Sequence, residues 1–349
     1  MYGPPLSRVV RLLVTGGAGF IGSNFVRLAV RKGHDVVVLD KLTYAANPEN
    51  LRDLLDGGRI EFVQRDICDP GAGDAARACD AIVHFAAETH VDRSITEAGD
   101  FVRTDVLGTH AMLEAARRER VDRFLHISTD EVYGESGRRP SREDSPLNPK
   151  SPYAASKAGA DRLAFAYHAT YGLPVVVTRC VNNYGPYQHP EKAVPLFSVS
   201  GIVGARLPVY GTGRNRREWI HVEDHCTALF ALLRRRGVDG ETFNIGTGDR
   251  RSTLEVAGSI VDALGLPRGR IARVADRPGH VASHAVDSGK LRRATGWRPA
   301  HAFDREIART VRWYSDHPGW WRPTVLGSAR AYFEERYPGF VASVEAFRA

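Results

Sequence analysis

Long apolar runs are missing from this 349-residue sequence, and no stretch approaches the ~18 uninterrupted apolar residues that a membrane span requires. The first eleven residues include two prolines and lead into a strand-like run, which is not typical of a secretory signal. The four cysteines show no CxxC or other metal-ligand spacing. We therefore expect a cytoplasmic protein that has no membrane segment and holds no metal.

Lysine is also scarce, with six residues among the 48 basic ones, and the net charge is +7. The sequence has no dense basic stripe interleaved with aromatic residues, so we do not expect it to bind nucleic acid. Where arginine is the usual basic residue, a lysine inside a motif indicates that a compact ammonium of adjustable pKa was needed.

Strand-like and helical segments alternate through the first half of the chain. Strand-like runs lie at 8–15, 34–40, 60–64, 81–85, 124–128 and 174–178. This alternation predicts an α/β fold with a doubly wound parallel (Rossmann) sheet and right-handed crossovers. Beyond Tyr184 the alternation becomes irregular, which indicates a smaller C-terminal substrate lobe. We expect a dinucleotide-binding domain at 1–185 with returning segments around 218–246, and a substrate lobe formed mainly by 186–217 and 247–349.

A glycine-rich turn joins the first predicted strand to the first predicted helix. Gly16 permits the tight turn, Gly19 lets the backbone approach a pyrophosphate, and Gly22 allows close helix–strand packing. Asp40 ends the second strand, eighteen residues beyond Gly22. Its carboxylate can accept hydrogen bonds from both ribose hydroxyls and would repel a 2′-phosphate, so the sequence favours NAD over NADP.

Further cofactor contacts are expected where later strands end. Asp66 and Ile67 follow the third strand and could meet the adenine, while Ala86 and Ala87 follow the fourth, where small residues let the nicotinamide half lie close. Simple packing is an alternative reason for the alanine pair. The predicted cofactor set is completed by Phe20, Ile21, Lys41, Thr43, Cys180, Tyr153 and Lys157.

The reactive groups are predicted at the ends of the fifth strand and the following helix. Tyr153 and Lys157 are one helical turn apart, so the ammonium can lower the pKa of the phenol and make it a usable base. Thr129 precedes two adjacent acids, Asp130 and Glu131, directly after an apolar strand. The acids could be a solvated loop pair, but their position favours two further proton transfers and elimination of water.

These motifs resemble those of the extended short-chain dehydrogenase/reductase family and, within its epimerase/dehydratase branch, the nucleotide-sugar 4,6-dehydratases. The matching segments are TGGAGFIGSNFVR (15–27), LDKLTYAANPENL (39–51), HFAAETHVDRSI (84–95), STDEVYG (128–134), SPYAASKAGAD (151–161), TRCVNNYGPYQHPEK (178–192), REWIHVEDH (217–225) and DRPGH (276–280).

The resemblance implies that Tyr153, aided by Thr129, takes the sugar C4 hydroxyl proton while C4 gives a hydride to NAD. Glu131 then takes the C5 proton, Asp130 protonates the departing C6 hydroxyl, and the hydride returns to C6 to give a 4-keto-6-deoxy sugar. The resemblance also implies dTDP-glucose as substrate, NAD that is tightly held and recycled, and a homodimer formed through helices at about 96–117 and 152–171.

Substrate contacts are implied by the same resemblance. The sugar pocket would be lined by Glu88, His90 and Ser94, and the diphosphate would be bound by Asn182, Lys192 and Arg217. The base would pack on Pro208 and Tyr210. Further substrate contacts would come from Arg277 and His280. Two segments, 244–249 and 281–284, depart from the family pattern near the expected nucleotide pocket.

Several alternatives therefore stay open. A UDP-sugar dehydratase is possible, although Glu88 favours dTDP. A 4-epimerase would need no acid pair, and a decarboxylase would be expected to pair an arginine with a C6 carboxylate. A non-catalytic NAD-binding protein often lacks the tyrosine or the lysine, and both are present here.

Overall fold

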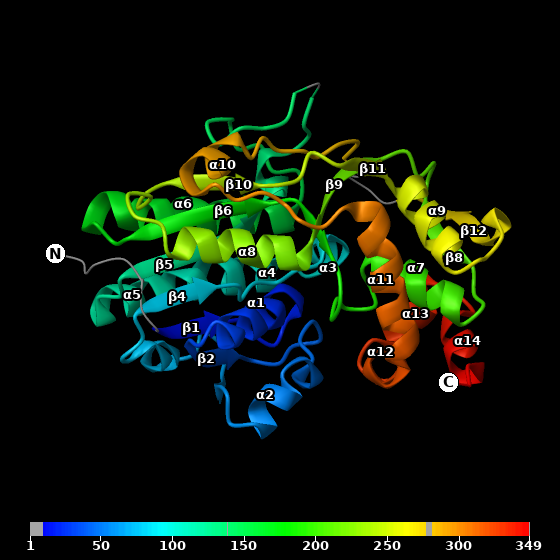
Figure 1. Cartoon of the computed structure of the whole chain (residues 1–349), viewed down its shortest axis with the longest axis horizontal. Helices are drawn as coiled ribbons and strands as arrows, with labels where there is room; N and C mark the ends of the chain where they lie inside the picture. The colour runs from blue at the N-terminus through cyan, green and yellow to red at the C-terminus, as the bar shows by residue number, and fades with distance from the viewer. Residues whose placement is uncertain (1–9, 138, 277–280, 349) are drawn as a thin grey trace.

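A seven-stranded sheet forms the centre of the computed structural model, which describes residues 10–137, 139–276 and 281–348 (Figure 1). Its strand order is β10-β6-β5-β4-β1-β2-β3, and every neighbouring pair is parallel. The strands are β1 (Arg11–Thr15), β2 (Asp35–Asp40), β3 (Glu61–Gln64), β4 (Ala81–His84), β5 (Arg123–Thr129), β6 (Val175–Cys180) and β10 (Thr242–Ile245). The predicted doubly wound parallel sheet is confirmed.

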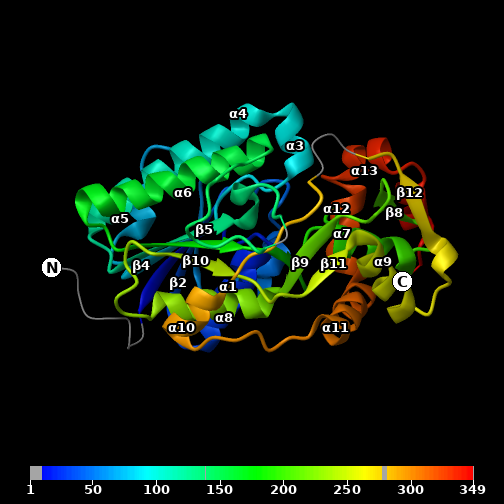
Figure 2. The same ribbon diagram turned by 90° about the horizontal axis from the view of Figure 1, so that it is seen from above.

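Helices cover both faces of this sheet, which explains why its inner strands are buried apolar runs such as Val36–Leu39. In Figure 2 one layer contains α4, α5 and α6, and the opposite layer contains α1, α8 and α10. The bounds are α1 (Phe20–Arg31), α4 (Ala98–Phe101), the π-helix η3 (Val102–Gly108), α5 (Thr109–Glu119), α6 (Pro152–Tyr171), α8 (Val222–Leu233) and α10 (Gly289–Thr295).

The ends of α6 follow the local sequence closely. The Oγ of Ser151 accepts a hydrogen bond from the backbone N–H of Ala154, and Pro152 occupies the first turn, where its missing N–H costs nothing. Gly172 ends the helix in the left-handed region at φ 66°. These signals fix the length of the helix that carries Tyr153 and Lys157.

A second lobe lies beyond one end of the sheet and has its own apolar core, which includes Trp321, Tyr314 and Phe333 (Figure 1). It contains a three-stranded sheet, β11-β9-β7, and a two-stranded sheet, β12-β8. The strands are β7 (Asn182–Tyr184), β8 (Leu207–Tyr210), β9 (Arg216–His221), β11 (Arg250–Ser252) and β12 (Ile271–Val274). The helices are α7 (Ala193–Ile202), α9 (Thr253–Ala263), α11 (Phe303–Asp316), α12 (Pro318–Leu326), α13 (Arg330–Arg336) and α14 (Phe340–Ala346).

The chain returns to the large sheet after entering this lobe. β10 pairs with β6 at the sheet edge and α8 packs on α1, whereas β9 pairs with β7 and β11 instead. The remaining short elements are η1 (Pro48–Asn50), α2 (Arg52–Asp56), η2 (Ala72–Ala76), α3 (Val91–Thr96), η4 (Asp130–Tyr133) and η5 (Arg268–Arg270).

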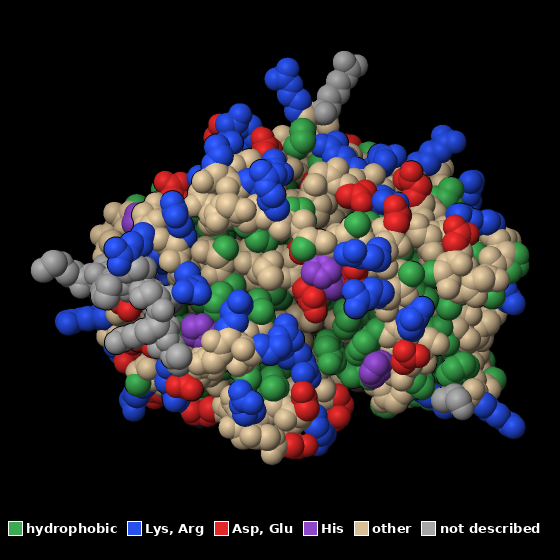
Figure 3. Space-filling view, in the orientation of Figure 1, with side chains coloured by type: hydrophobic (Ala, Val, Ile, Leu, Met, Phe, Trp, Pro, Cys, Tyr) green, Lys and Arg blue, Asp and Glu red, His purple; other side chains and the backbone are tan. Residues whose placement is uncertain are grey.

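Charged side chains of both signs are interspersed over the face shown in Figure 3, where arginine and lysine do not gather into one continuous patch. In the described part of the chain, no helix has the length and apolar character needed to cross a membrane.

Candidate active site

One cavity of about 440 Å³ opens at the carboxyl ends of the parallel strands and continues to the second lobe. It joins the predicted cofactor residues to the predicted substrate residues in a single space. The predicted residues that line it are Gly16, Gly19, Phe20, Ile21, Gly22, Asp40, Lys41, Thr43, Ile67, Ala86, Ala87, Glu88, His90, Thr129, Glu131, Tyr153, Lys157, Cys180, Asn182, Lys192, Pro208, Tyr210 and Arg217.

The glycine turn has no room for side chains at its two tightest positions. Gly16 has φ +68°, and a Cβ there would lie 2.6 Å from the backbone nitrogen of Ala86. A Cβ on Gly22 would lie 2.2 Å from the carbonyl oxygen of Gly16. Gly19 immediately precedes α1, so the first N–H groups of that helix face the cavity side of the turn. The turn therefore fits a pyrophosphate, as the NAD motif requires.

Asp40 stands at the end of β2, where it accepts hydrogen bonds from the backbone N–H groups of Ala18 at 3.0 Å and Leu42 at 2.8 Å. These bonds hold the carboxylate in place and leave acceptor capacity for ribose hydroxyls. Burial raises the pKa of Asp40, and the two backbone bonds act in the opposite direction. The residues present at this end of the cavity fit NAD.

Asp66 is not among the described residues that line the cavity, but it pairs with Lys41, which does line it. Lys41 lies 3.5 Å from Asp66 and 3.4 Å from Glu88, so the ammonium bridges the predicted adenine and sugar regions. Arg103 also approaches Asp66, at 3.2 Å. Asp66 thus contacts neighbouring cations, and its predicted contact with adenine stays a prediction.

Tyr153 is partly buried near the end of β5, where it hydrogen-bonds to Thr129 and its ring packs edge-on against that of Phe101. Burial raises the pKa of Tyr153 well above its ordinary value, and the charges of Glu131 and Asp105 act in the same direction, while a hydrogen bond with Thr129 lowers it. The expected lowering of this pKa by Lys157 is therefore not found in the structure. The reason is that burial and the nearby carboxylates raise this pKa, and the only opposing effect identified is the hydrogen bond with Thr129.

Lys157 is buried, and its Nζ donates a 2.8 Å hydrogen bond to the backbone carbonyl of Ile127. Burial lowers the pKa of Lys157, whereas Asp105 and Asp161 raise it. The ammonium is therefore anchored to β5 rather than to the phenol, at a wall of the cavity close to the cofactor side.

Asp130 and Glu131 begin the short helix η4, and Thr129 accepts a hydrogen bond from the N–H of Glu131. Asp130 is almost fully buried, and its Oδ2 has no hydrogen-bond partner in the described structure. Burial first, and then the charges of Glu131 and Glu218, raise the pKa of Asp130 well above its ordinary value. The direction of this shift agrees with the expected rise and favours the protonated form of Asp130. Glu131 lines the cavity, whereas Asp130 is not among the described residues that line it.

The substrate side is built by segments far apart in the sequence. Lys192 donates to the carbonyl of Thr89 at 2.6 Å, and Arg217 donates to the carbonyl of Val281 at 2.9 Å. Tyr210 on β8 lies with its hydroxyl 3.0 Å from that of Tyr337. Asn182 begins β7 and also faces the cavity.

Of the predicted substrate residues that the structure describes, Ser94 does not line the cavity. Ser94 is fully buried in α3, where its hydroxyl donates to the carbonyl of Val91 at 2.6 Å, because α3 turns that side chain into its own backbone. Arg277 and His280 lie outside the described residues. The departing segments 244–249 and 281–284 do not line the cavity either, as far as they are described, although Val281 contacts Arg217.

Sequence reasoning missed Asp105, which lies in η3 beneath the site. It accepts hydrogen bonds from the backbone N–H of Glu88 at 2.8 Å and from the hydroxyl of Ser156 at 2.5 Å. Burial raises the pKa of Asp105 to about 6 against the charge of Lys157. The same segment also contains an arginine and a threonine, so its sequence, VRTDVLG, offered no clear signal for this acid.

Two tyrosines from the C-terminal region were also missed. Tyr332 and Tyr337 line the cavity from α13 and its end, and Tyr332 packs edge-on against His90. Aromatic residues near a C-terminus are typical of simple packing, so the sequence offered no signal for their place in the site.

Comparisons with known proteins agree with this site. The family model for GDP-mannose 4,6 dehydratase matches residues 13–310. A dTDP-glucose 4,6-dehydratase from Streptomyces niveus is 50% identical over 321 residues, covering 90% of this chain and 95% of the relative. A solved dTDP-glucose 4,6-dehydratase from Streptomyces venezuelae with NAD bound is 50% identical, covers 90% of this chain and 99% of its own, and has a TM-score of 0.87.

Epimerases share the fold at lower identity. The structure of a UDP-glucose 4-epimerase from Thermotoga maritima is 27% identical, covers 88% of this chain and 99% of its own, and has a TM-score of 0.82. The fold alone therefore does not separate epimerases from dehydratases, whereas the sequence identity does.

The parallel sheet, the glycine turn and the Tyr153–Lys157 pair define an enzyme of the extended short-chain dehydrogenase/reductase class with NAD as its cofactor. Within that class the chain belongs to the dTDP-glucose 4,6-dehydratase family, whose members are nucleotide-sugar lyases.

Proposed function

We propose that this enzyme removes water from dTDP-glucose to give dTDP-4-keto-6-deoxyglucose, with Tyr153, Thr129, Asp130 and Glu131 performing the proton transfers. The observation that carries the proposal is the single cavity, which joins the glycine turn to an acid pair and to the cationic groups of the second lobe. Bound NAD supplies a hydride acceptor at C4, a hydride donor at C6 and, when oxidised, a positively charged ring.

Tyr153 accepts the proton of the C4 hydroxyl, and Thr129 holds the phenol by its hydrogen bond. The phenol needs a nearby positive charge to act near neutral pH, because burial raises its pKa. Lys157, fixed by the carbonyl of Ile127, is positioned to bind the nicotinamide ribose and adds such a charge.

Glu131 accepts the C5 proton because its carboxylate faces the cavity. Asp130 donates a proton to the departing C6 hydroxyl, since burial raises the pKa of that acid and so favours its protonated form. Adjacent carboxyl groups with different environments thus take the two opposite roles that elimination of water requires.

The second lobe holds the nucleotide diphosphate. Lys192 and Arg217 are cations on the cavity wall, and Asn182 adds an amide donor. Tyr210 and Pro208 of β8 offer a flat surface to the base, while Glu88 and His90 meet the sugar.

The assembly proposed is a homodimer formed through the long helices. All five large apolar side chains that are exposed in the described structure lie on α3, η3 and α6, namely Ile95, Val102, Leu107, Phe165 and Tyr171. A gathered apolar surface of this kind marks an interaction site, and a second copy of the same helix pair matches it. Four free cysteines, three of them buried, fit the reducing cytoplasm that we propose as its location.

The test is to incubate the purified enzyme, without added NAD, with dTDP-glucose and UDP-glucose in parallel. We expect only dTDP-glucose to be converted to a keto sugar that has lost one water. Mass spectrometry detects the loss of water, and absorbance after base treatment detects the keto sugar. Product from UDP-glucose alone would contradict the nucleotide assignment, and a product of unchanged mass would indicate epimerisation instead.

A further inference from the structure

Four polar side chains form a buried network beside the reactive groups, and each comes from a different element. They are Tyr133 at the end of η4, Asp161 on α6, Arg179 on β6 and Asn244 on β10. All four are at most 5% exposed, and none of them is among the described residues that line the cavity. Any effect of these side chains on the reaction therefore has to act through their neighbours.

Arg179 is the centre of this network. Its Nε donates to Oδ2 of Asp161 at 2.8 Å and its Nη2 donates to Oδ1 at 3.0 Å, which makes a bidentate pair. Its Nη1 donates to the hydroxyl of Tyr133 at 2.8 Å, and its guanidinium lies 4.8 Å from the centre of the Tyr133 ring. The Tyr133 hydroxyl in turn donates to Oδ1 of Asn244 at 2.8 Å. In the described structure, none of these four side chains has a buried polar atom without a hydrogen-bond partner.

The network joins the two elements that carry the proposed reactive groups. Asp161 follows Lys157 by one helical turn on α6, and Tyr133 ends the short helix that begins with the acid pair. That helix, η4, has only four residues, which is too few to hold its own position. Thr129 caps its start, and the hydroxyl of Tyr133 fixes its end to β6 and β10.

Directional bonding accounts for this network better than stability does. A buried ion pair is weak evidence of stabilisation, because apolar side chains of similar volume often serve as well. A planar guanidinium fork fixes the orientation of its partners, and a fully bonded buried network makes the surrounding structure rigid. A site with several proton transfers needs that rigidity, since its groups have to be held within about 0.5 Å of the productive geometry.

We propose that Arg179, Asp161 and Tyr133 are positioning residues that hold η4 at a fixed place against α6. The acid pair of η4 then meets the same sugar that Tyr153 on α6 contacts. This inference rests on the proposed function, and it adds the side chains that keep the two halves of the reaction in register.

Tyr133→Phe tests the proposal most directly, because it keeps the ion pair of Arg179 with Asp161 and loses only the hydroxyl that bonds η4 to β6 and β10. We expect kcat for dTDP-glucose to fall by about 10- to 100-fold, since a small misplacement of reacting groups costs up to about that factor. KM and the NAD bound per chain should stay within about twofold of the unaltered enzyme, because binding is not altered. Exchange of the C5 hydrogen with deuterated solvent should slow together with kcat, since Glu131 lies on η4.

Arg179→Lys separates the geometry of the network from its charge. Lysine keeps a positive charge beside Asp161 but lacks the planar fork that also reaches Tyr133. The value of kcat should fall at least as far as in Tyr133→Phe. A full kcat in Arg179→Lys would show that charge alone is sufficient and would overturn the positioning role.

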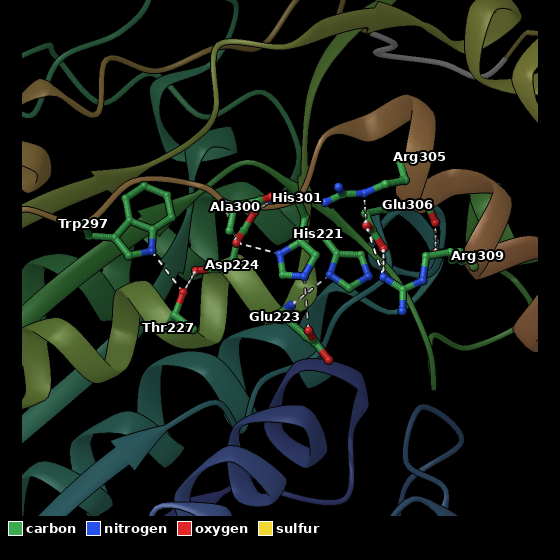
Figure 4. A network of polar contacts seen from close by, with 11 residues as sticks. His221, Glu223, Asp224, Thr227, Trp297, Ala300, His301, Arg305, Glu306 and Arg309 are labelled. Carbon is green, nitrogen blue, oxygen red and sulfur yellow. Dashed lines mark hydrogen bonds and ion pairs between the residues drawn. The ribbon is translucent and has the colours of Figure 1, made fainter.

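Two controls distinguish this role from the simple loss of a polar contact. Arg162 donates to the same Asp161 carboxylate at 2.7 Å, but its side chain is 48% exposed, so Arg162→Gln should leave kcat unchanged. Asp224 is a buried acid in a separate network, where it accepts hydrogen bonds from the backbone N–H groups of Ala300 and His301 (Figure 4). Asp224→Asn should lower the free energy of unfolding in urea and leave kcat unchanged, because Asp224 is not among the described residues that line the cavity.

The outcomes separate this inference from the proposed function. If the unaltered enzyme does not convert dTDP-glucose, the proposed function fails before any variant is compared. If the unaltered enzyme converts the sugar and Tyr133→Phe keeps the full kcat, the positioning role is overturned. It is also overturned if Asp224→Asn loses as much kcat as Tyr133→Phe, because the loss of any buried polar network would then have the same effect.

Discussion

Asp105 accepts a 2.5 Å hydrogen bond from the hydroxyl of Ser156, which stands between Tyr153 and Lys157 in the reactive helix turn. This bond ties the π-helix η3 to α6 at the point where the reactive side chains leave the helix. The charge of Asp105 also raises the pKa values of both Tyr153 and Lys157. Asp105 is therefore a positioning residue that acts through its neighbours.

Replacing Asp105 by Asn should move the pH dependence of catalysis. Without the negative charge the pKa of Tyr153 falls, so the acidic limb of kcat/KM should shift to lower pH. Steady-state rates measured across pH in unaltered enzyme and variant give the shift. Asp100→Asn, an exposed acid in the adjacent α4, is the control and should leave the limb in place. A limb that stays still or moves upward in Asp105→Asn would contradict this role.

The same variant should change how stability depends on pH. Burial raises the pKa of Asp105 from 3.8 to about 6, so the native state holds this proton more tightly than the unfolded state. The stability that it contributes is fully present below about pH 4 and is lost as the pH rises through about 6. Asn cannot ionise, and the variant should therefore gain free energy of unfolding relative to the unaltered enzyme across that range.

The size of that gain follows from the pKa difference, since one pKa unit corresponds to about 1.4 kcal/mol and the full change to about 3 kcal/mol. Urea unfolding at pH 4, 5, 6 and 7 on both proteins is the measurement. A stability difference that stays constant with pH would show that Asp105 does not titrate in this window.

The acid pair predicts separate defects for its two members. Asp130→Asn cannot protonate the departing hydroxyl, and Glu131→Gln cannot accept the C5 proton, so each should lower the rate of water loss by about 10²–10⁴-fold. Exchange of the C5 hydrogen with deuterated solvent should persist in Asp130→Asn and be lost in Glu131→Gln. Equal exchange in both variants would mean that the two roles are assigned wrongly. Glu135→Gln, at a nearby position outside the cavity, serves as the control.

The local features of this protein could be predicted from its sequence because each depends on adjacent residues. The glycine turn, the strand that ends at Asp40 and the helix that begins after Ser151 all rest on signals within one element. Six strands of the large sheet lie within a few residues of their predicted positions, since buried parallel strands are continuous apolar runs.

Features that depend on contacts between distant segments could not be predicted in this way. The pairing of Asp105 with Ser156 spans 51 residues, and that of Tyr210 with Tyr337 spans 127. The pKa of Tyr153 was expected to fall because Lys157 is a sequence neighbour, whereas burial, which only the fold determines, raises it.

Asp40 should decide whether the enzyme keeps its cofactor. Asp40→Ala removes the carboxylate that the N–H groups of Ala18 and Leu42 hold in place, and with it the proposed bonds to the ribose. We expect the variant to be purified with little NAD and to regain activity when NAD is added. Asp35→Ala alters the exposed start of the same strand and is the control. NAD measured in the denatured protein gives the answer, and full retention in Asp40→Ala would contradict the assignment.

The hydroxyl pair of Tyr210 and Tyr337 should affect substrate binding more than chemistry. It joins β8 to the end of α13 across the outer wall of the cavity, far along the chain from the acid pair. Tyr337→Phe loses a hydrogen bond of about 0.5–1.5 kcal/mol, so KM for dTDP-glucose should rise by about two- to tenfold. The value of kcat should stay nearly constant, because binding that is equal in the ground and transition states sets KM alone. Tyr171→Phe alters an exposed hydroxyl at the end of α6 and should change neither constant. A fall in kcat with unchanged KM would instead place Tyr337 among the groups that act on the reacting sugar.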